Sequence, residues 1–259
     1  MTDSMEVTGI VLSAMPMGEA DRRVLLLTKE MGKISAFVRG ARKPTSSMVA
    51  ATRPFAFGTF EVHPGKSAYT VQKSDIAEYF EDLSKDMPKY AYGCYFLELA
   101  GYFTHENAPA GDVLELLYYS LRALLNPKIP DRLVRRVFEL KILALEGVVP
   151  DFGACVKCGK EMTEAVFLPS MMNAVCADCG NRGAGNAPSS YRPAGLPLSK
   201  SALYALRFVL ATPSPKLYTF SLSGETFGQI APVVEKLCET NVDRPLKARE
   251  MLAVLAAGD

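Results

Sequence analysis

The sequence lacks the features by which most enzymes are recognised. It holds only two histidines, His63 and His105, and neither stands in a catalytic or metal-binding motif. There is no Gly-x-Ser-x-Gly step, no phosphate-binding loop ending in Lys-Ser or Lys-Thr, and no His-Glu-x-x-His. The carboxylates are scattered, without the spacing of metal ligands. We therefore predict that the protein is not an enzyme.

Long apolar runs and targeting segments are also missing. No run approaches the roughly 20 apolar residues that cross a bilayer. The opening MTDSMEVTG has neither the basic nor the apolar stretch of a signal peptide. We therefore expect a cytoplasmic protein with no membrane contact. In that reducing compartment, paired cysteines are metal ligands or redox groups more often than disulfides.

What the chain does have is an uneven charge distribution. Its 259 residues carry a net charge of +1. Residues 22–73 nevertheless hold ten Lys or Arg against two acidic residues, Glu30 and Glu61, which leaves a surplus of eight positive charges. A basic block on a near-neutral chain is typical of a protein with a polyanionic partner. The alternative is an ordinary solvated surface.

The first eighty residues favour β-structure. Short segments rich in aliphatic, β-branched and aromatic residues are separated by turn residues, with a break at Gly58. They cover residues 6–15, 22–28, 33–40, 54–64 and 67–80. Residues 39–48 have no apolar period and indicate a loop or a short helical turn. Five short strands with no long helix between them predict a small closed barrel of the oligonucleotide-binding type, the OB-fold.

After residue 82 the apolar period becomes helical, and the positions from Leu83 through Met87 to Gly101 predict one helical face. We expect helices over residues 83–101, 111–125, 131–147, 199–212, 225–241 and 246–257, and a loop over 180–190. The predicted fold class is therefore α+β and multidomain. Its expected parts are an OB-fold domain over 1–80, a helical domain over 81–154 that resumes over 181–259, and a metal-binding insertion over 155–180.

Four cysteines define that insertion. Cys155 and Cys158 form one Cys-x-x-Cys step, and Cys176 and Cys179 form a second after 17 residues. This spacing is typical of a four-cysteine zinc site, in which a hairpin brings two tight knuckles together. Four thiolates close the tetrahedron and leave no position for water. We therefore predict one structural zinc ion per chain and no catalytic metal.

Other states of these thiols are redox pairs, local disulfides, an iron–sulfur cluster or a metal-free form. A redox pair normally stands in a thioredoxin-like βαβ setting, which this sequence does not have. The two remaining cysteines, Cys94 and Cys238, fall on apolar helical stretches, so we expect them to be buried.

Taken together, these segments resemble the RecO family of bacterial recombination mediators. The resemblance rests on VTGIVLSAMPMGEADRRVLLLTKEMGKISAFVRGARKPTS, on PFAFGTFEV, and on the cysteine quartet after a helical stretch. It covers nearly the whole chain. One departure is Met172-Asn173-Ala174, where family members often carry a glycine pair, so the hairpin turn there can differ.

The resemblance implies an N-terminal oligonucleotide-binding barrel, a helical domain and a zinc-binding insertion. It also implies binding of single- and double-stranded DNA, annealing of complementary strands, and a nucleoid-associated role in the RecF pathway of DNA repair and recombination. RecO-like proteins pair with the ring-forming protein RecR and help load the recombinase RecA onto DNA coated with single-strand-binding protein. They also bind the acidic C-terminal tail of that coating protein.

We predict that the basic block contacts DNA backbones without reading sequence. Arg39, Arg42 and Lys43 stand on a loop that can present cations to phosphates. The track is extended by Arg22, Arg23, Lys33, Arg53, Lys66 and Lys73. The residues that could stack on bases, although we expect most of them in the core, are Phe37, Phe55, Phe57, Phe60 and Tyr69.

A second basic group opens the third predicted helix. Arg132, Arg135 and Arg136 share one helical face. With apolar neighbours they can form a site for an acidic partner peptide that ends in a hydrophobic residue. The alternatives are an ordinary helix surface or intramolecular ion pairs.

The residues alone leave two other functions open. The first is a zinc-containing scaffold for protein interactions that does not bind DNA, which a gel shift with a labelled oligonucleotide would reveal. The second is a zinc-dependent enzyme, for which a cysteine scan with metal analysis would show a ligand set other than four sulfurs.

Overall fold

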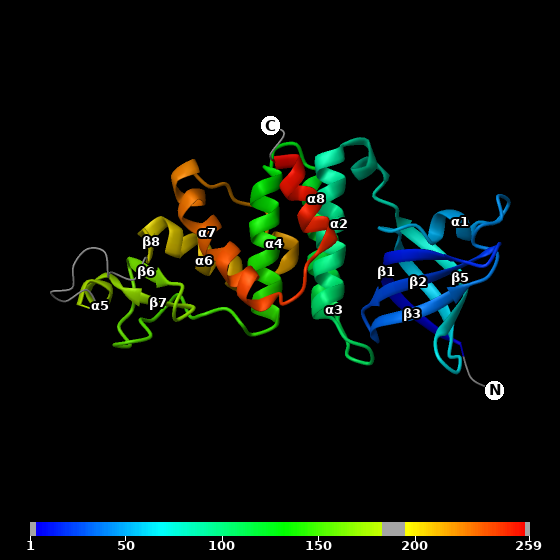
Figure 1. Cartoon of the computed structure of the whole chain (residues 1–259), viewed down its shortest axis with the longest axis horizontal. Coiled ribbons are helices and arrows are strands. Elements are labelled where there is room, and N and C mark those ends of the chain that lie inside the picture. The colour runs from blue at the N-terminus through cyan, green and yellow to red at the C-terminus, as the bar shows by residue number, and fades with distance from the viewer. Residues whose placement is uncertain (1–3, 183–194, 257–259) are drawn as a thin grey trace. The chain divides into compact units, whose positions relative to one another are not determined.

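The computed structural model describes residues 4–182 and 195–256 (Figure 1). The first part is a closed barrel with the strand order β1-β2-β3-β5-β4. Only β3 and β5 pair in parallel. The strands are β1 (Met5–Met17), β2 (Asp21–Thr28), β3 (Gly32–Val38), β4 (Phe57–His63) and β5 (Tyr69–Glu78). This confirms the predicted five-stranded barrel.

The barrel closes because β1 pairs with two strands, β2 and β4. Its first half pairs with β4 and its second half with β2, and the register shifts between Val11 and Ser13. On β3 and β4, alternate residues point inward and form a core that includes Ile34 and Phe60. A side chain at Gly58 would collide with the backbone of β5, so the predicted break is a point where two strands approach closely. A short helix, α1 (Met48–Ala51), lies in the connection from β3 to β4.

Three helices accompany the barrel. They are α2 (Met87–Phe103), α3 (Gly111–Leu124) and α8 (Lys247–Ala256), and the 3₁₀ helix η1 (Glu81–Lys85) leads into α2. The Asp86 carboxylate caps α2 by accepting a hydrogen bond from the Lys89 amide at 3.1 Å. Helix α8 packs against α2. The Glu98 carboxylate of α2 accepts hydrogen bonds from the Lys247 and Ala248 amides, and it thereby caps α8 from outside that helix.

The second part contains a small sheet of order β7-β6-β8 together with helices. Its elements are α4 (Asp131–Leu145), β6 (Ala165–Leu168), β7 (Asn173–Cys176), α5 (Ala177–Arg182), β8 (Leu196–Leu198), α6 (Lys200–Ala211), the 3₁₀ helix η3 (Ser214–Lys216) and α7 (Gly224–Asn241). Ser199 and Ser223 cap α6 and α7. Pro232 lies inside α7.

The structure differs from the sequence expectations in several places. Cys238 is buried as expected, but Cys94 is only partly buried. The helical face predicted to begin at Leu83 was wrong at its start, because α2 begins only at Met87, whose side chain is 62% exposed. The short elements α5 and β8 were not predicted. Most of the loop predicted over 180–190 lies outside the described residues, and its first three residues belong to α5.

The contacts divide the chain into two units, Met1–Asp131 with Leu246–Asp259, and Arg132–Pro245. The barrel and α8 therefore belong to the first unit, and the cysteine segment belongs to the second. The four-part division by role stays a prediction. In the part of the chain that the structure describes, no helix combines the length and apolarity that a membrane span requires.

Candidate metal centre and nucleic-acid interface

The four predicted cysteines of the second unit meet at one point. The sulfur atoms of Cys155, Cys158, Cys176 and Cys179 all lie within 4.8 Å of one another. The sulfurs of Cys158 and Cys176 are 3.8 Å apart. Four sulfurs placed about 2.3 Å from a central zinc ion would be separated by about 3.8 Å. All four cysteines are free thiols. The donor set and its spacing therefore fit a tetrahedral metal ion.

Local backbone geometry forms the first knuckle. The Cys155 amide donates to the Lys160 carbonyl, and the Gly159 amide donates back to the Cys155 carbonyl, both at 2.8 Å. Gly159 has a φ of 71°, where a side chain would be strained. The β6–β7 hairpin brings the second knuckle opposite, because Cys176 ends β7 and Cys179 lies in α5.

The turn of that hairpin shows a local strain. Met172 has a φ of 48°, in the left-handed region that glycine adopts freely. This is the position at which the sequence departs from the glycine pair that the family resemblance leads one to expect. The ligands are unaffected, because β6 and β7 keep a regular antiparallel register from Leu168↔Asn173 to Ala165↔Cys176.

The thiols differ in acidity. Burial alone would raise the pKa of Cys155, but hydrogen bonds from the backbone amides of Cys176, Cys158 and Lys157 outweigh it and lower this pKa to about 6. Hydrogen bonds with the side chains of Cys158 and Cys176 raise the pKa of Cys179 to about 12.

Hydrogen bonds from α6 hold the chain on both sides of the first Cys-x-x-Cys step of the metal module, residues 155–180. The Arg207 guanidinium donates to the carbonyls of Phe152 at 3.0 and 2.8 Å, Gly153 at 3.2 Å and Met162 at 2.6 Å. These residues flank the first knuckle, so Arg207 ties the module to a helix. Sequence reasoning missed this residue because its partners are 45 to 55 positions away.

In the first unit, the predicted basic loop docks on the turn between β1 and β2. The Gly40 amide donates to Asp21 Oδ1 at 2.8 Å. Arg42 donates to the Ala20 carbonyl through its amide and to the Gly18 carbonyl through its guanidinium. The loop and the turn thus form one end of the barrel, the turn end. The exposed cations on it are Arg39, Arg42 and Lys43.

A cross-strand row lies next to the turn end on the outer face of the barrel. Arg23 on β2 stands opposite Met15 on β1 and Phe37 on β3. Its guanidinium carbon is 6.0 Å from the centre of the Phe37 ring, and its Nε donates to Ser35 Oγ at 2.8 Å. A cation beside an aromatic ring matches a nucleotide, which offers a phosphate and a base to stack.

Three of the predicted DNA-contacting cations also bond to other residues of the first unit. The half-buried Arg22 donates to Val49 O and Thr52 Oγ1, which fixes α1 on the barrel. Lys33 donates to the Gly101 carbonyl of α2 at 2.6 Å. Lys73 forms an exposed ion pair with Glu61 on β4, 3.4 Å apart. The predicted track is therefore less continuous than the sequence suggests.

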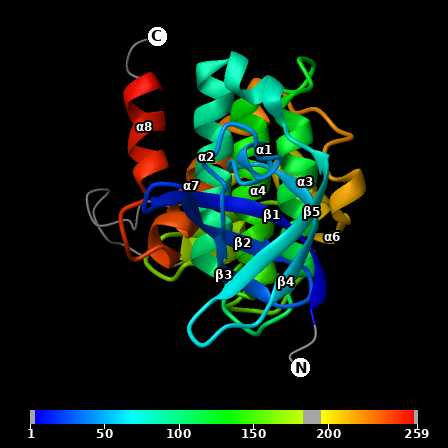
Figure 2. The same cartoon turned by 90° about the vertical axis from the view of Figure 1, so that its right-hand side faces the viewer.

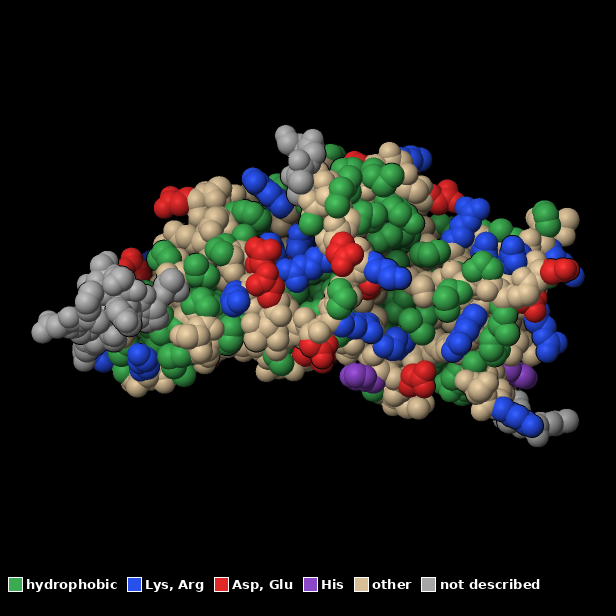
Figure 3. Space-filling model, viewed as in Figure 1, with side chains coloured by type: hydrophobic (Ala, Val, Ile, Leu, Met, Phe, Trp, Pro, Cys, Tyr) green, Lys and Arg blue, Asp and Glu red, His purple; other side chains and the backbone are tan. Residues whose placement is uncertain are grey.

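The remaining two cations, Arg53 and Lys66, are exposed. Within residues 4–182 and 195–256, neither side chain makes a hydrogen bond or an ion pair. Figure 3 shows Lys and Arg side chains spread over the visible face of the barrel, with apolar side chains between them. The role of each of these cations in DNA binding stays a prediction.

Most of the aromatic candidates are core residues, as expected. Phe55 and Phe60 are buried. Phe57 packs on Tyr118 of α3 with ring centres 4.7 Å apart. Tyr69 packs against the barrel core. Phe37, beside Arg23, is the candidate that adjoins an exposed cation.

The second basic group divides in two. Arg135 and Arg136 are 18% and 12% exposed and pair with the buried Glu139 at 2.9 and 2.7 Å. Arg136 also pairs with Glu235 of α7. These two follow the alternative of intramolecular ion pairing. Arg132 is exposed and lies 5.2 Å from the centre of the Phe227 ring.

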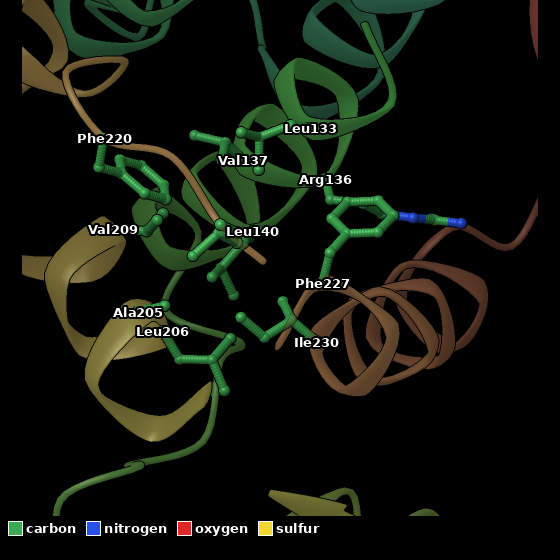
Figure 4. Close-up of a pocket in the computed structure, with 11 residues that line it drawn as sticks. Leu133, Arg136, Val137, Leu140, Ala205, Leu206, Val209, Phe220, Phe227 and Ile230 are labelled. Atoms are coloured by element: carbon green, nitrogen blue, oxygen red, sulfur yellow. The ribbon is translucent and has the colours of Figure 1, made fainter. Parts of the chain in front are cut away.

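A narrow apolar slot runs beside Arg136, between α4, α6 and α7 (Figure 4). Its accessible volume is about 10 Å³, which is the space of one water molecule. A larger groove of about 690 Å³ adjoins it and shares Phe220 and Leu222 with it. Lys200, Tyr204 and Phe208 line the groove. A peptide therefore finds room in the groove and not in the slot.

A closed barrel of the oligonucleotide-binding type, joined to helices and to a module with four converging thiols, defines the class: a multidomain OB-fold protein with a cysteine metal site. Residues 1–80 match the family model "Recombination protein O N terminal", and residues 84–250 match "Recombination protein O C terminal". The chain belongs to the RecO family, which confirms the resemblance seen in the sequence.

Curated relatives agree with this assignment. The chain is 31% identical over 253 residues to "DNA repair protein RecO" of Symbiobacterium thermophilum, covering 96% of each chain. It is 27% identical over 241 residues to the protein of the same name from Acetivibrio thermocellus, covering 93% of this chain and 92% of the relative. A third protein of that name, from Bacillus pumilus, is 29% identical over 244 residues.

Proposed function

We propose that this chain is a DNA repair and recombination mediator that binds single- and double-stranded DNA without sequence specificity and anneals complementary strands. The observation that carries the proposal is the turn end of the barrel. There, Arg39, Arg42 and Lys43 are exposed on a loop whose shape is fixed by bonds to the β1–β2 turn. Cations on a rigid loop contact phosphates of any sequence.

Annealing follows from the same charge. Two complementary strands repel each other through their phosphates, and cations that neutralise both backbones lower that repulsion. The bases need no contact with the protein and remain available for pairing. A role of this kind requires no catalytic group, so we infer that the protein is not an enzyme.

The test is DNA binding across a salt series. Each lost phosphate contact lowers the log–log salt slope by about 0.7 for a single strand. The double variant Arg39→Glu with Lys43→Glu removes two exposed cations whose side chains make no bonds within the described residues. We expect its slope to fall by about 1.4 and its annealing rate to fall with it.

The matched control is Lys128→Glu with Lys216→Glu, which makes the same charge change at exposed positions outside the barrel strands and their connecting loops. An equal slope for wild type and the loop variant would remove the turn end from the DNA interface. If the wild type shifts no oligonucleotide at any salt concentration, the alternative of a protein-interaction scaffold takes its place.

We infer that the metal is zinc and that it is structural. Four cysteine sulfurs are a ligand set that selects zinc or iron–sulfur clusters, and they leave no open position for catalysis. Metal analysis should give one zinc per chain. A metal other than zinc, or fewer than four sulfurs around it, would contradict this assignment.

We further propose that the chain acts with RecR to load RecA onto DNA coated with single-strand-binding protein, and that it binds the acidic tail of that coating protein. The groove of about 690 Å³ supports the last contact, because it combines the exposed Lys200 with Tyr204 and Phe208. A labelled acidic peptide ending in phenylalanine should bind wild type and lose affinity in Tyr204→Ala. Unchanged affinity would place the peptide elsewhere, with Arg132 as the next position to test.

A further inference from the structure

A third cavity, separate from the slot and the groove of the second unit, lies in the first unit and is lined by Arg53, one of the predicted DNA-contacting cations. Its accessible volume is about 240 Å³. That is below the roughly 300–1,000 Å³ of pockets for drug-sized ligands, so it suits one planar ring system better than a whole nucleotide. Its walls come from α1 and the turn after it, from the end of β5 and η1, and from α2. Both views show α1 at the upper end of the barrel (Figures 1 and 2).

The walls of this cavity hold two strained aromatic residues. Phe55 and Phe80 line it, and both have left-handed backbones, with φ values of 75° and 51°. Such conformations are costly for bulky side chains and concentrate at ligand clamps and switches. The Phe55 amide donates to Val11 O, and the Phe80 amide donates to Glu78 Oε1. These bonds to the barrel strands hold the strained shape in place.

Phe55 and Phe80, which line the cavity, each pack against another aromatic ring. Phe80 meets Tyr118 of α3 edge to face at 5.7 Å between ring centres. Phe55 meets Tyr90 of α2 in the same manner, also at 5.7 Å, and Tyr90 lines the cavity too. The cavity is therefore a largely preformed aromatic box, because Phe55, Phe80 and Tyr90 are each held by contact with another ring.

The open side of the cavity offers an exposed ring and a cation. Tyr79 lines the cavity and is 37% exposed. Arg53 lines it too, and its guanidinium makes no hydrogen bond or ion pair with any described residue. Glu81 adds a carboxylate, which accepts hydrogen bonds from the amino groups on base edges. An aromatic face, a cation and a hydrogen-bond acceptor together match a nucleobase with its adjoining phosphate.

The position of the cavity along the chain links it to the turn end. The loop with Arg39 and Lys43 leads directly into α1, and Arg53 follows α1 by two residues. The Arg22 guanidinium holds α1 against the barrel through Val49 O and Thr52 Oγ1. A DNA strand whose phosphates contact the loop cations can therefore reach Arg53 along α1, which Arg22 holds against the barrel.

We propose that this cavity receives one unstacked base of a single strand that is bound at the turn end, with Arg53 on the neighbouring phosphate and Tyr79 against the base. The inference rests on the proposed DNA binding. A base in this box is unavailable for pairing, so the contact favours single strands over duplex. It is given up when the strand anneals, which releases the duplex product.

Photo-crosslinking tests the proposal directly. The probe is an oligonucleotide of about 20 nucleotides, longer than the roughly 4–16 that one OB-fold covers, with iodouracil in place of thymine. Mass spectrometry should find the crosslink at Tyr79 or Tyr90. Tyr79→Ala should weaken single-strand binding about 5- to 150-fold, the range for loss of one stacked base, and leave duplex binding unchanged. Tyr79→Phe keeps the ring and should restore single-strand binding.

Leu145→Ala, which removes an apolar side chain of nearly the same exposure, 38%, from the second unit, is the matched control and should keep full DNA affinity. Crosslinks found only outside the cavity would overturn the inference, as would unchanged single-strand affinity in Tyr79→Ala. An equal loss for single strands and duplex would also overturn it, because that result marks a backbone contact. These failures leave the proposed function standing as long as wild type binds DNA with a steep salt slope. Absence of wild-type binding would remove the proposed function itself.

Discussion

Replacing Arg207 by methionine tests whether α6 holds the metal module in shape. The substitution keeps an unbranched apolar stem and removes the guanidinium. That group donates four hydrogen bonds to three carbonyls, of Phe152, Gly153 and Met162. Phe152 is buried, so water replaces these bonds poorly.

The size of the effect follows from the number of carbonyls. A hydrogen bond to a charged group contributes about 1.5–3 kcal/mol net, so three carbonyls at the lower value give about 4.5 kcal/mol. Because the more exposed carbonyls regain bonds with water, we expect a loss of about 3 kcal/mol. For a unit of this size, that corresponds to a fall in Tm of roughly 10 °C.

The assay combines thermal unfolding with metal release to a chromogenic chelator. Arg207→Met should lower the transition of the second unit and speed metal release. The transition temperature and the metal-release rate of Arg207→Lys should lie between those of wild type and Arg207→Met, since a single ammonium group cannot reproduce the planar guanidinium fork. Lys200→Met, at the exposed start of the same helix, is the control. Metal release and a transition equal to those of wild type would show that the module is held by its own hairpin and metal alone.

Two further changes probe other parts of the second unit. Glu139→Gln removes the buried carboxylate that pairs with Arg135 and Arg136. We expect the free energy of unfolding, measured with denaturant, to fall by about 3–5 kcal/mol. A fall below about 1 kcal/mol would show that the ion pairs contribute little to the fold and would reopen a partner-binding role for these arginines. Met172→Gly relieves the backbone strain of the left-handed turn between β6 and β7. After the entropy cost of glycine is subtracted, the free energy of unfolding should rise by about 0.5–1 kcal/mol. A fall in the free energy of unfolding would mean that the contact of the Met172 side chain with Thr240 stabilises the protein by more than the backbone strain destabilises it.

Local patterns in the sequence were enough to predict the barrel and the convergence of the four cysteines, whose role as zinc ligands stays a prediction. Alternation along 33–38 and 57–63 is visible within each strand, and the two Cys-x-x-Cys steps carry their spacing with them. Elements of three to six residues, such as β8 and α5, were missed because they are too short for a period. Glu139 stands three and four residues from two arginines, so its pairing was visible in the sequence, but its burial was not.

Long-range contacts were beyond the sequence. Lys33 and its acceptor Gly101 are 68 positions apart, and Arg22 and Thr52 are 30 apart. Nothing local distinguishes such cations from Arg39 or Lys43, which stay exposed. The aromatic box was hidden for the same reason, because Phe55, Tyr79 and Tyr90 come from three segments that are far apart in the chain.

The division among the basic residues changes what the charge surplus of residues 22–73 means. A surplus of eight positive charges suggests a broad cationic face. The side chains of Arg22 and Lys33, however, donate hydrogen bonds to carbonyl and hydroxyl oxygens within the first unit. These bonds cost the DNA surface some charge, but they fix α1 and the helices to the barrel. In the proposed DNA complex, a rigid surface would lose less conformational entropy than a mobile one, so the anchored cations would favour binding indirectly. Arg22 holds α1, which follows the loop of Arg39 and Lys43 in the chain and precedes Arg53, so the proposed strand would reach both without reordering that helix.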